Sequence, residues 1–186
     1  MQLLQSYPQL RERIVFLTMD LKESECLHLV TKEFPETDYM MGIREDVTAS
    51  AALGISLASQ GRIIPVVGTF AAFLLNMGAQ LRVARETPGA RFIVYMSHAE
   101  TLDVGADGPT HQPEYFVGMG LNLSLETFLP ADANTMWDVL YHAVDRIIND
   151  QNTGIFLIGG VRGTDLSSGV YDFKLTDPTV DSFLAW

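Results

Sequence analysis

Short runs of β-branched and aromatic residues alternate with helix-like segments along nearly the whole chain, and this alternation is what most constrains the fold. The clearest strand, at 91–96, contains Phe92, Ile93, Val94 and Tyr95 and has the continuous apolar character of a strand buried on both faces. Further strands are expected at 14–19, 38–41, 63–67, 125–129 and 154–158, and helices at 25–34, 46–60, 71–85 and 134–149. We expect Gly68 to end the strand that precedes it. Strands separated by helices of this length predict right-handed crossovers and a mainly parallel sheet, an α/β fold with three layers, α/β/α.

Composition narrows the class of protein. The 186 residues are expected to form one domain, 1–186, and with 47% apolar and 19% charged residues that domain is globular. The net charge of −11 argues against nucleic acid or an anionic membrane as a partner. No apolar stretch reaches the roughly 20 residues that span a bilayer. A single cysteine, Cys26, and the lack of a signal-peptide pattern at 1–13 predict a cytoplasmic protein.

In parallel α/β folds, ligands bind in the loops at the carboxyl ends of the strands, here expected at 42–46, 68–73 and 97–112. The first two of these loops also have a purely structural explanation, whereas the third is long and rich in histidine and aspartate, which is typical of a functional loop. Acids at 45 and 46 complement the positive end of a helix dipole, and aromatic residues at 70 and 73 pack into a core as readily as they support a flat heterocycle. The spacing of His98, Asp103, Asp107 and His111 fits no compact metal motif, and no Gly-x-Ser-x-Gly sequence supports a nucleophilic serine.

The order of these motifs resembles the pyrimidine-binding (PYR) domain of the thiamine diphosphate-dependent transketolase family. The resemblance covers roughly residues 10–160. The matching pieces are Gly-Ile-Arg-Glu at 42–45, Gly54, Gly-Thr-Phe-Ala-Ala-Phe at 68–73, Ser-His at 97–98, Asp-Gly-Pro-Thr-His-Gln-Pro at 107–113 and Pro-Ala-Asp at 130–132.

The resemblance implies a role for each residue that matches the family's motifs. Glu45 would hydrogen-bond the pyrimidine N1′ of thiamine diphosphate and promote activation of the thiazolium carbon. Phe73 and secondarily Phe70 would stack on the pyrimidine. His98, Asp107 and His111 would bind the hydroxyl groups of a ketose donor, with the two histidines also acting in proton transfer. Arg162 is the one residue that could replace the family's phosphate-binding arginine, so a sugar phosphate is not a secure substrate.

The sequence contains no Gly-Asp-Gly followed about thirty residues later by Asn, the family's pattern for Mg²⁺ and diphosphate. We therefore expect a separate diphosphate-binding subunit to hold Mg²⁺ and most of the diphosphate, within a heterotetramer that acts on a small-molecule or carrier-bound substrate. The function predicted is transfer of a two-carbon ketol or acyl unit. Two alternatives remain: a non-catalytic PYR paralogue that scaffolds a partner, and acyl transfer from a 2-oxo acid such as pyruvate.

Overall fold

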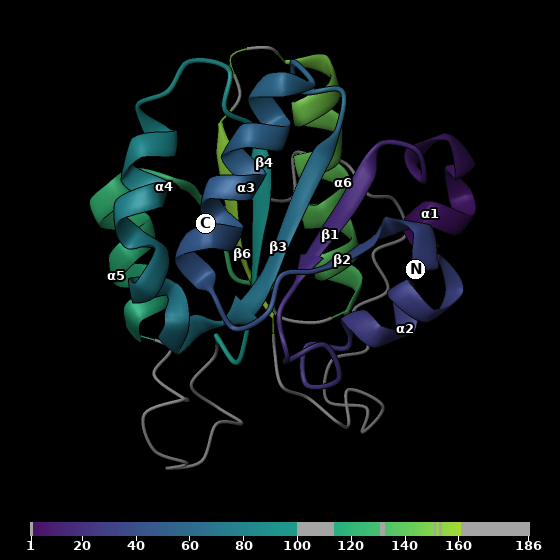
Figure 1. Cartoon of the computed structure of the whole chain (residues 1–186), viewed down its shortest axis with the longest axis horizontal. Helices are drawn as coiled ribbons and strands as arrows, with labels where there is room; N and C mark the ends of the chain where they lie inside the picture. Colours follow the sequence, from purple (N-terminus) through teal and green to yellow (C-terminus); the bar gives the residue numbers. More distant parts are fainter. Residues whose placement is uncertain (1, 100–113, 131–132, 151, 153, 161–186) are drawn as a thin grey trace.

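Six parallel strands form one open sheet in the order β2-β1-β3-β4-β6-β5 in the computed structural model, which describes residues 2–99, 114–130, 133–150, 152 and 154–160 (Figure 1). The strands are β1 (Ile14–Thr18), β2 (Asp38–Met40), β3 (Ile64–Phe70), β4 (Phe92–Ser97), β5 (Glu126–Phe128) and β6 (Ile155–Gly159). Because every pairing is parallel, the carboxyl ends of all six strands meet at one edge, the lower edge in Figure 1. The predicted α/β class and parallel sheet are confirmed.

Helices cover both faces of the sheet. One face carries α3 (Glu45–Ala58), α4 (Gly78–Arg85) and α5 (Glu114–Leu123), and the other carries α1 (Gln2–Ser6), α2 (Leu27–Glu33) and α6 (Ala133–Asn149) (Figure 1). Short 3-10 segments η1 (Pro8–Leu10), η2 (Pro35–Thr37) and η3 (Ala71–Met77) connect them. None of the helices in the described ranges combines the length and apolar character needed to cross a membrane.

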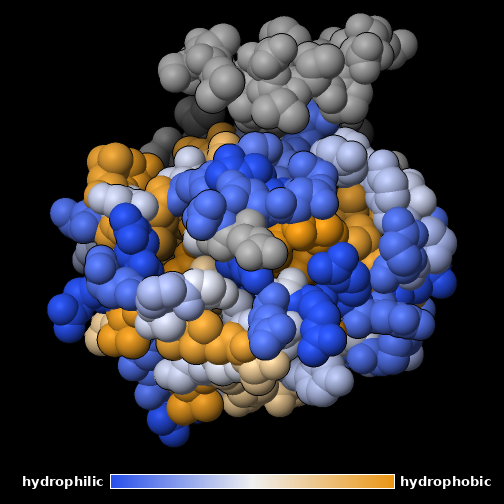
Figure 2. Space-filling model, turned by 90° about the horizontal axis from the view of Figure 1, so that it is seen from above, coloured by the Kyte–Doolittle hydropathy of each residue, from blue (hydrophilic) through white to orange (hydrophobic). Residues whose placement is uncertain are grey.

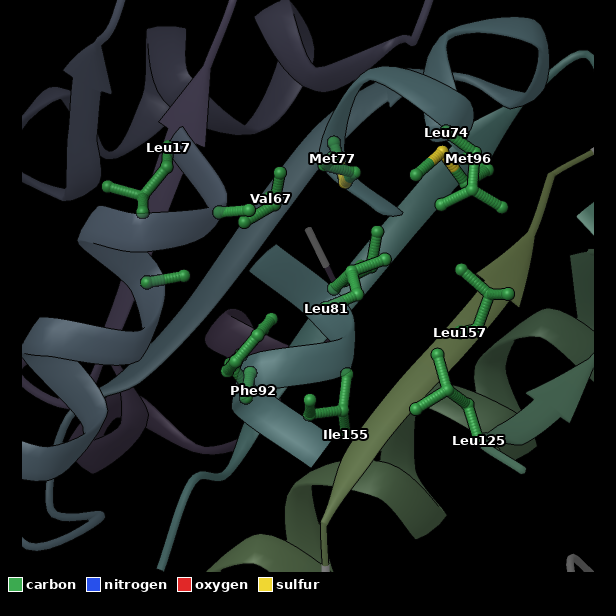
Figure 3. Packing of buried hydrophobic residues seen from close by; sticks show 14 of the residues in the cluster. Leu17, Val67, Leu74, Met77, Leu81, Phe92, Met96, Leu125, Ile155 and Leu157 are labelled. Carbon is green, nitrogen blue, oxygen red and sulfur yellow. The ribbon is translucent and has the colours of Figure 1, made fainter. Parts of the chain in front are cut away.

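The alternation of side chains along each buried strand divides the core into two layers. In β3, Val67 points toward the α3–α4–α5 side, where it packs in one cluster with Leu81 and Phe92 (Figure 3). Its neighbour Val66 belongs to the opposite cluster, with Ile147 of α6 and Phe156 of β6. Each layer is therefore sealed by a different set of helices, and the sheet has no solvent-facing side in its centre.

Three local predictions were wrong, and one helix was not predicted. The strand expected to stop at Gly68 continues to Phe70, because the glycine provides clearance inside the sheet and does not break it. The helix expected from residue 25 begins at Leu27, since Cys26 adopts a left-handed conformation (φ 58°). The helix expected over 71–85 is divided into η3 and α4. Helix α5 was not predicted, because Gly118 and Gly120 interrupt its pattern.

The packing of α4 provides a stability test with a control on the same helix. Leu81 is fully buried against the sheet, whereas Val83 is 53% exposed. We expect Leu81→Ala to lower the free energy of unfolding by about 2–5 kcal/mol, because it removes buried methyl groups and leaves a cavity. Val83→Ala should change it by no more than about 0.5 kcal/mol. Urea unfolding of both variants measures the difference, and equal losses would contradict the assigned face of α4.

Candidate active site

The sheet has a point at which the direction of chain winding reverses. The segment after β1 leads to α2 on one face of the sheet, whereas the segment after the adjacent strand β3 leads to η3 and α4 on the other face. Adjacent loops that leave in opposite directions open a crevice at the carboxyl ends of their strands, and ligands of open α/β sheets bind in such crevices. A ligand-binding site is therefore expected at the β1/β3 boundary and the strand ends beside it.

Three of the predicted site residues lie together at this edge. The register pairs Phe70 of β3 with Ser97 of β4, so the next residue, His98, lies beside the Phe70 ring, with a centroid separation of 4.2 Å. Phe73 stacks on Phe70 at 5.8 Å with an interplanar angle of 9°. The stack forms because Phe73 lies in the first turn of a 3-10 segment, where residues three apart are eclipsed.

His98 is held in an unusual backbone conformation. Its φ of 58° is uncommon for a residue with a side chain, and such strain concentrates at functional sites. The imidazole is only 2% exposed, and its Nδ1 lies 2.9 Å from the Ser97 hydroxyl oxygen. Ser97 therefore fixes the orientation of the ring, with the donor set by the histidine tautomer.

The adjacent acids Glu45 and Asp46 at the start of α3 are in different environments. Asp46 is exposed and accepts hydrogen bonds from Arg44 Nε and a terminal guanidinium nitrogen, both at 3.1 Å, and this pairing lowers the pKa of Asp46. Glu45 is only 7% exposed, and its carboxylate has no hydrogen-bond partner among the described residues. Asp46 thus provides the exposed negative charge that is common at the start of a helix. Glu45 is largely buried, and its carboxylate remains able to accept a hydrogen bond from a ligand.

The other predicted residues, Asp107, His111 and Arg162, lie outside the described part of the chain. Within the described ranges, no group of three or more histidine, cysteine, aspartate or glutamate side chains is arranged to hold a metal ion.

Sequence reasoning missed a second buried acid, Glu25, in the segment between β1 and α2. Its side chain is 2% exposed, and neither carboxylate oxygen has a hydrogen-bond partner in the described part of the chain. The carboxyl lies against β3: a Cβ atom at Gly68 would be 2.6 Å from Glu25 Oε2 and would also collide with Leu27 Cδ1. Glu25 therefore lies at the β1/β3 boundary. Its carboxyl is next to Gly68, which precedes Phe70 by two residues and lies on the same face of β3.

Burial raises the pKa of Glu25 from an ordinary value near 4.5 to about 8, so the carboxyl is largely protonated at neutral pH. The titratable groups around it are Tyr95, which is paired with Gly68 in the β3–β4 register, and Cys26. Burial also raises the pKa of the Tyr95 phenol, and the charges of Cys26 and Glu25 raise it further.

A signal for Glu25 was present in the sequence. The rule that pointed to the loops after the second, third and fourth strands applies equally to the segment after the first strand, which contains Glu25. That segment was interpreted as the start of a helix because its apolar spacing from Cys26 onward is helical.

A hollow of about 510 Å³ lies at the opposite edge of the sheet, among residues that precede β4, β5 and β6, including Arg85, Gly89 and Ser124. Figure 2 views the molecule from above the orientation of Figure 1, toward the end from which the strands begin, where hydrophilic side chains surround smaller hydrophobic patches. The strained histidine, the stacked rings and the two buried acids all lie at the other end.

Comparison with known proteins agrees with this geometry. The family model for the transketolase pyrimidine-binding domain matches residues 1–158. The chain belongs to this family. A transketolase-like protein 2 of Mus musculus is 32% identical over 139 residues, which are 74% of this chain and 21% of the mouse protein. Matches to other curated transketolases cover between 13% and 23% of their length, so this chain corresponds to one part of those proteins.

Solved transketolases share the fold. The transketolase of Leishmania mexicana superposes with a TM-score of 0.65 at 21% identity, over 80% of this chain and 22% of that chain. A structure described as a split gene transketolase, inactive beta4 tetramer, superposes with a TM-score of 0.60 at 24% identity, over 87% of this chain and 48% of that chain. The three-layer PYR fold is therefore the fold of this chain.

The raised pKa of Glu25 makes a prediction for stability against pH. Between about pH 5 and pH 8 the folded chain retains a proton that the unfolded chain has lost, so the free energy of unfolding should fall by a few kcal/mol as pH rises through this window and level off above it. Urea unfolding at a series of pH values measures the slope. Glu25→Gln should flatten this part of the curve, whereas Glu23→Gln, an exposed acid in the same segment, should leave it unchanged. A wild-type stability that rises across this window would contradict the assignment.

Proposed function

We propose that this chain is the PYR subunit of a two-chain transketolase-like enzyme that transfers a two-carbon ketol or acyl unit with thiamine diphosphate. The observation that carries the proposal is the contrast at the start of α3, where Glu45 is buried without a partner and the neighbouring Asp46 is exposed and paired. A carboxyl that only complemented a helix dipole would gain nothing from burial.

The residues at the carboxyl edge fit the pyrimidine half of the cofactor. An unpaired, nearly buried carboxyl can share a proton with a ring nitrogen, and the stacked Phe70 and Phe73 rings offer an apolar platform for a flat heterocycle. When bound, thiamine diphosphate supplies a nucleophilic thiazolium carbon that carries the two-carbon unit. Glu45 would hold a proton at the pyrimidine N1′.

His98 would orient substrate hydroxyl groups and move a proton, together with Asp107 and His111. The strained, buried conformation of His98 and its contact with Ser97 support this role, since a catalytic imidazole must be held in one orientation. The adjacent Phe70 ring restricts water around one face of the imidazole. Arg162 is retained as a candidate substrate contact.

A partner subunit is supported by the surface around Glu45. Four apolar side chains between β2 and the first turn of α3 are exposed: Tyr39 at 54%, Met40 at 52%, Ile43 at 69% and Val47 at 40%. An apolar cluster around a buried acid is typical of a surface that another protein covers. The 186 residues contain no Gly-Asp-Gly…Asn pattern, so the partner would bind Mg²⁺ and the diphosphate. The likeness to a split gene transketolase supports two separate chains, and we propose a heterotetramer.

Replacement of Glu45 separates catalysis from structure. In the complex with a diphosphate-binding subunit, Glu45→Gln should slow hydrogen–deuterium exchange at the thiazolium C2 by about 10²–10⁴-fold, because an amide cannot share an acidic proton with N1′. Asp46→Asn is the matched control: it removes the neighbouring, exposed charge and should leave exchange within a few-fold of wild type. Thermal stability is followed in parallel, and near-normal exchange in Glu45→Gln would remove this residue from the mechanism.

The need for a partner is tested by calorimetry. The chain alone should bind thiamine diphosphate and Mg²⁺ negligibly, and a mixture with the diphosphate-binding subunit should bind both stoichiometrically. Ile43→Asp should weaken assembly of the mixture, because it puts a charge on the apolar cluster, without lowering the melting temperature of the isolated chain. Tight cofactor binding by the isolated chain would contradict the proposed division of the site.

A further inference from the structure

Glu25 is not explained by the proposed mechanism, although it is as deeply buried as His98. We propose that Glu25 determines substrate specificity, by binding a hydroxyl group of an unphosphorylated substrate in the crevice between β1 and β3. This inference rests on the proposed function, since it names the class of substrate that the same site accepts. It adds a substrate contact from the β1–α2 segment to those expected from the loops after β2, β3 and β4.

The geometry indicates a ligand contact because the carboxyl has no partner of its own. Leaving the polar atoms of a buried group unpaired is destabilising, and such groups in folded proteins almost always find a hydrogen bond. Both oxygens of Glu25 lack one within the described ranges. The residues on either side, Ser24 and Cys26, are exposed, so Glu25 belongs to a segment that reaches the protein surface.

The position of Glu25 is that of a substrate contact. Its carboxyl lies against Gly68 at the reversal of strand order, and Gly68 is two residues from Phe70 on the same face of β3. That spacing along a strand is about 7 Å, the length of a small sugar fragment, and Phe70 in turn contacts His98. A substrate held by His98 could therefore extend along β3 to Glu25.

The charges of the described residues at this edge disfavour a phosphate. The described segments that follow the six strands carry two lysine or arginine side chains, Lys22 and Arg44, and each is already paired with an acid. Lys22 lies 2.7 Å from Asp38, and Arg44 lies 3.1 Å from Asp46. A phosphate beside Glu25 would thus meet an acid and no unpaired cation among the described residues.

A hydroxyl group fits this environment better than an ammonium group. Gly68 and Leu27 lie next to the carboxyl, Tyr95 and Cys26 are the titratable groups near it, and burial disfavours the charged carboxylate. An uncharged carboxylic acid both donates and accepts a hydrogen bond, as does a hydroxyl group, whereas an ammonium group would require the ionised carboxylate.

The test uses three aldehydes that differ at one position: D-glucose, glucose 6-phosphate and 6-amino-6-deoxyglucose. The complex with the diphosphate-binding subunit should show its highest kcat/KM with glucose. Glu25→Ala should lower kcat/KM for glucose by roughly 10-fold or more relative to its effect on kcat/KM for glucose 6-phosphate, because a hydrogen-bonding partner of the glucose hydroxyl is lost. Glu25→Gln, which still donates and accepts, should stay within a few-fold of wild type, and Glu23→Gln should match wild type.

A second measurement does not depend on turnover. In the full chain labelled with ¹³C-glutamate, the Glu25 carboxyl resonance, assigned by its loss in Glu25→Gln, should shift on addition of glucose and not of glucose 6-phosphate. If the complex does not turn over but this shift appears, the proposed function fails and the contact stands. The inference is overturned if glucose does not shift the resonance, or if the phosphate ester or the amino sugar has the highest kcat/KM. It is also overturned if Glu25→Ala lowers kcat/KM equally for all three aldehydes.

Discussion

The parallel pairing of β3 with β4 is the interaction on which the rest of the architecture depends. Both strands are almost wholly buried, with helices on either side, so their backbone groups can be satisfied only by adjacent strands. The same pairing brings Phe70 level with Ser97, which determines where His98 and the stacked rings lie. The hydrogen bonds between β3 and β4 therefore also determine the relative positions of the candidate site residues at the ends of these strands.

Around that edge the chain uses acids in two ways. Asp46 is paired with Arg44 at the surface, where such pairs contribute little to stability, and the part-buried Asp38 is paired with Lys22. Glu25 is buried with both carboxylate oxygens unpaired in the described chain, which is unfavourable for the isolated fold, and Glu45 is 7% exposed with no hydrogen-bond partner among the described residues. The proposed roles of these acids would explain why the chain keeps them despite this cost, and the exposed apolar side chains near Glu45 in the sequence fit the same explanation.

Much of this fold could be predicted from the sequence, because buried parallel strands are continuous apolar runs and the helices between them have clear periodicity. The prediction failed where a local signal had two explanations. Gly68 looks like a strand end because glycine usually weakens a strand, but here a neighbouring side chain needs the space. Phe70, Phe73 and His98 were identified from motifs. Glu25 was not, because its burial results from contact with a strand more than forty residues away, and the helical spacing from Cys26 onward was the stronger local pattern.

The clearance at Gly68 has a consequence for variation in this family. A methyl group there would meet both Leu27 and the Glu25 carboxyl, so residues 25, 27 and 68 cannot change independently. A relative with alanine or a larger residue at the position of Gly68 must have a smaller or displaced side chain at the other two. The co-occurrence of glycine and glutamate at these two positions would then serve as a compact signature, readable from sequence alone, for subunits that share this arrangement of the β1/β3 crevice.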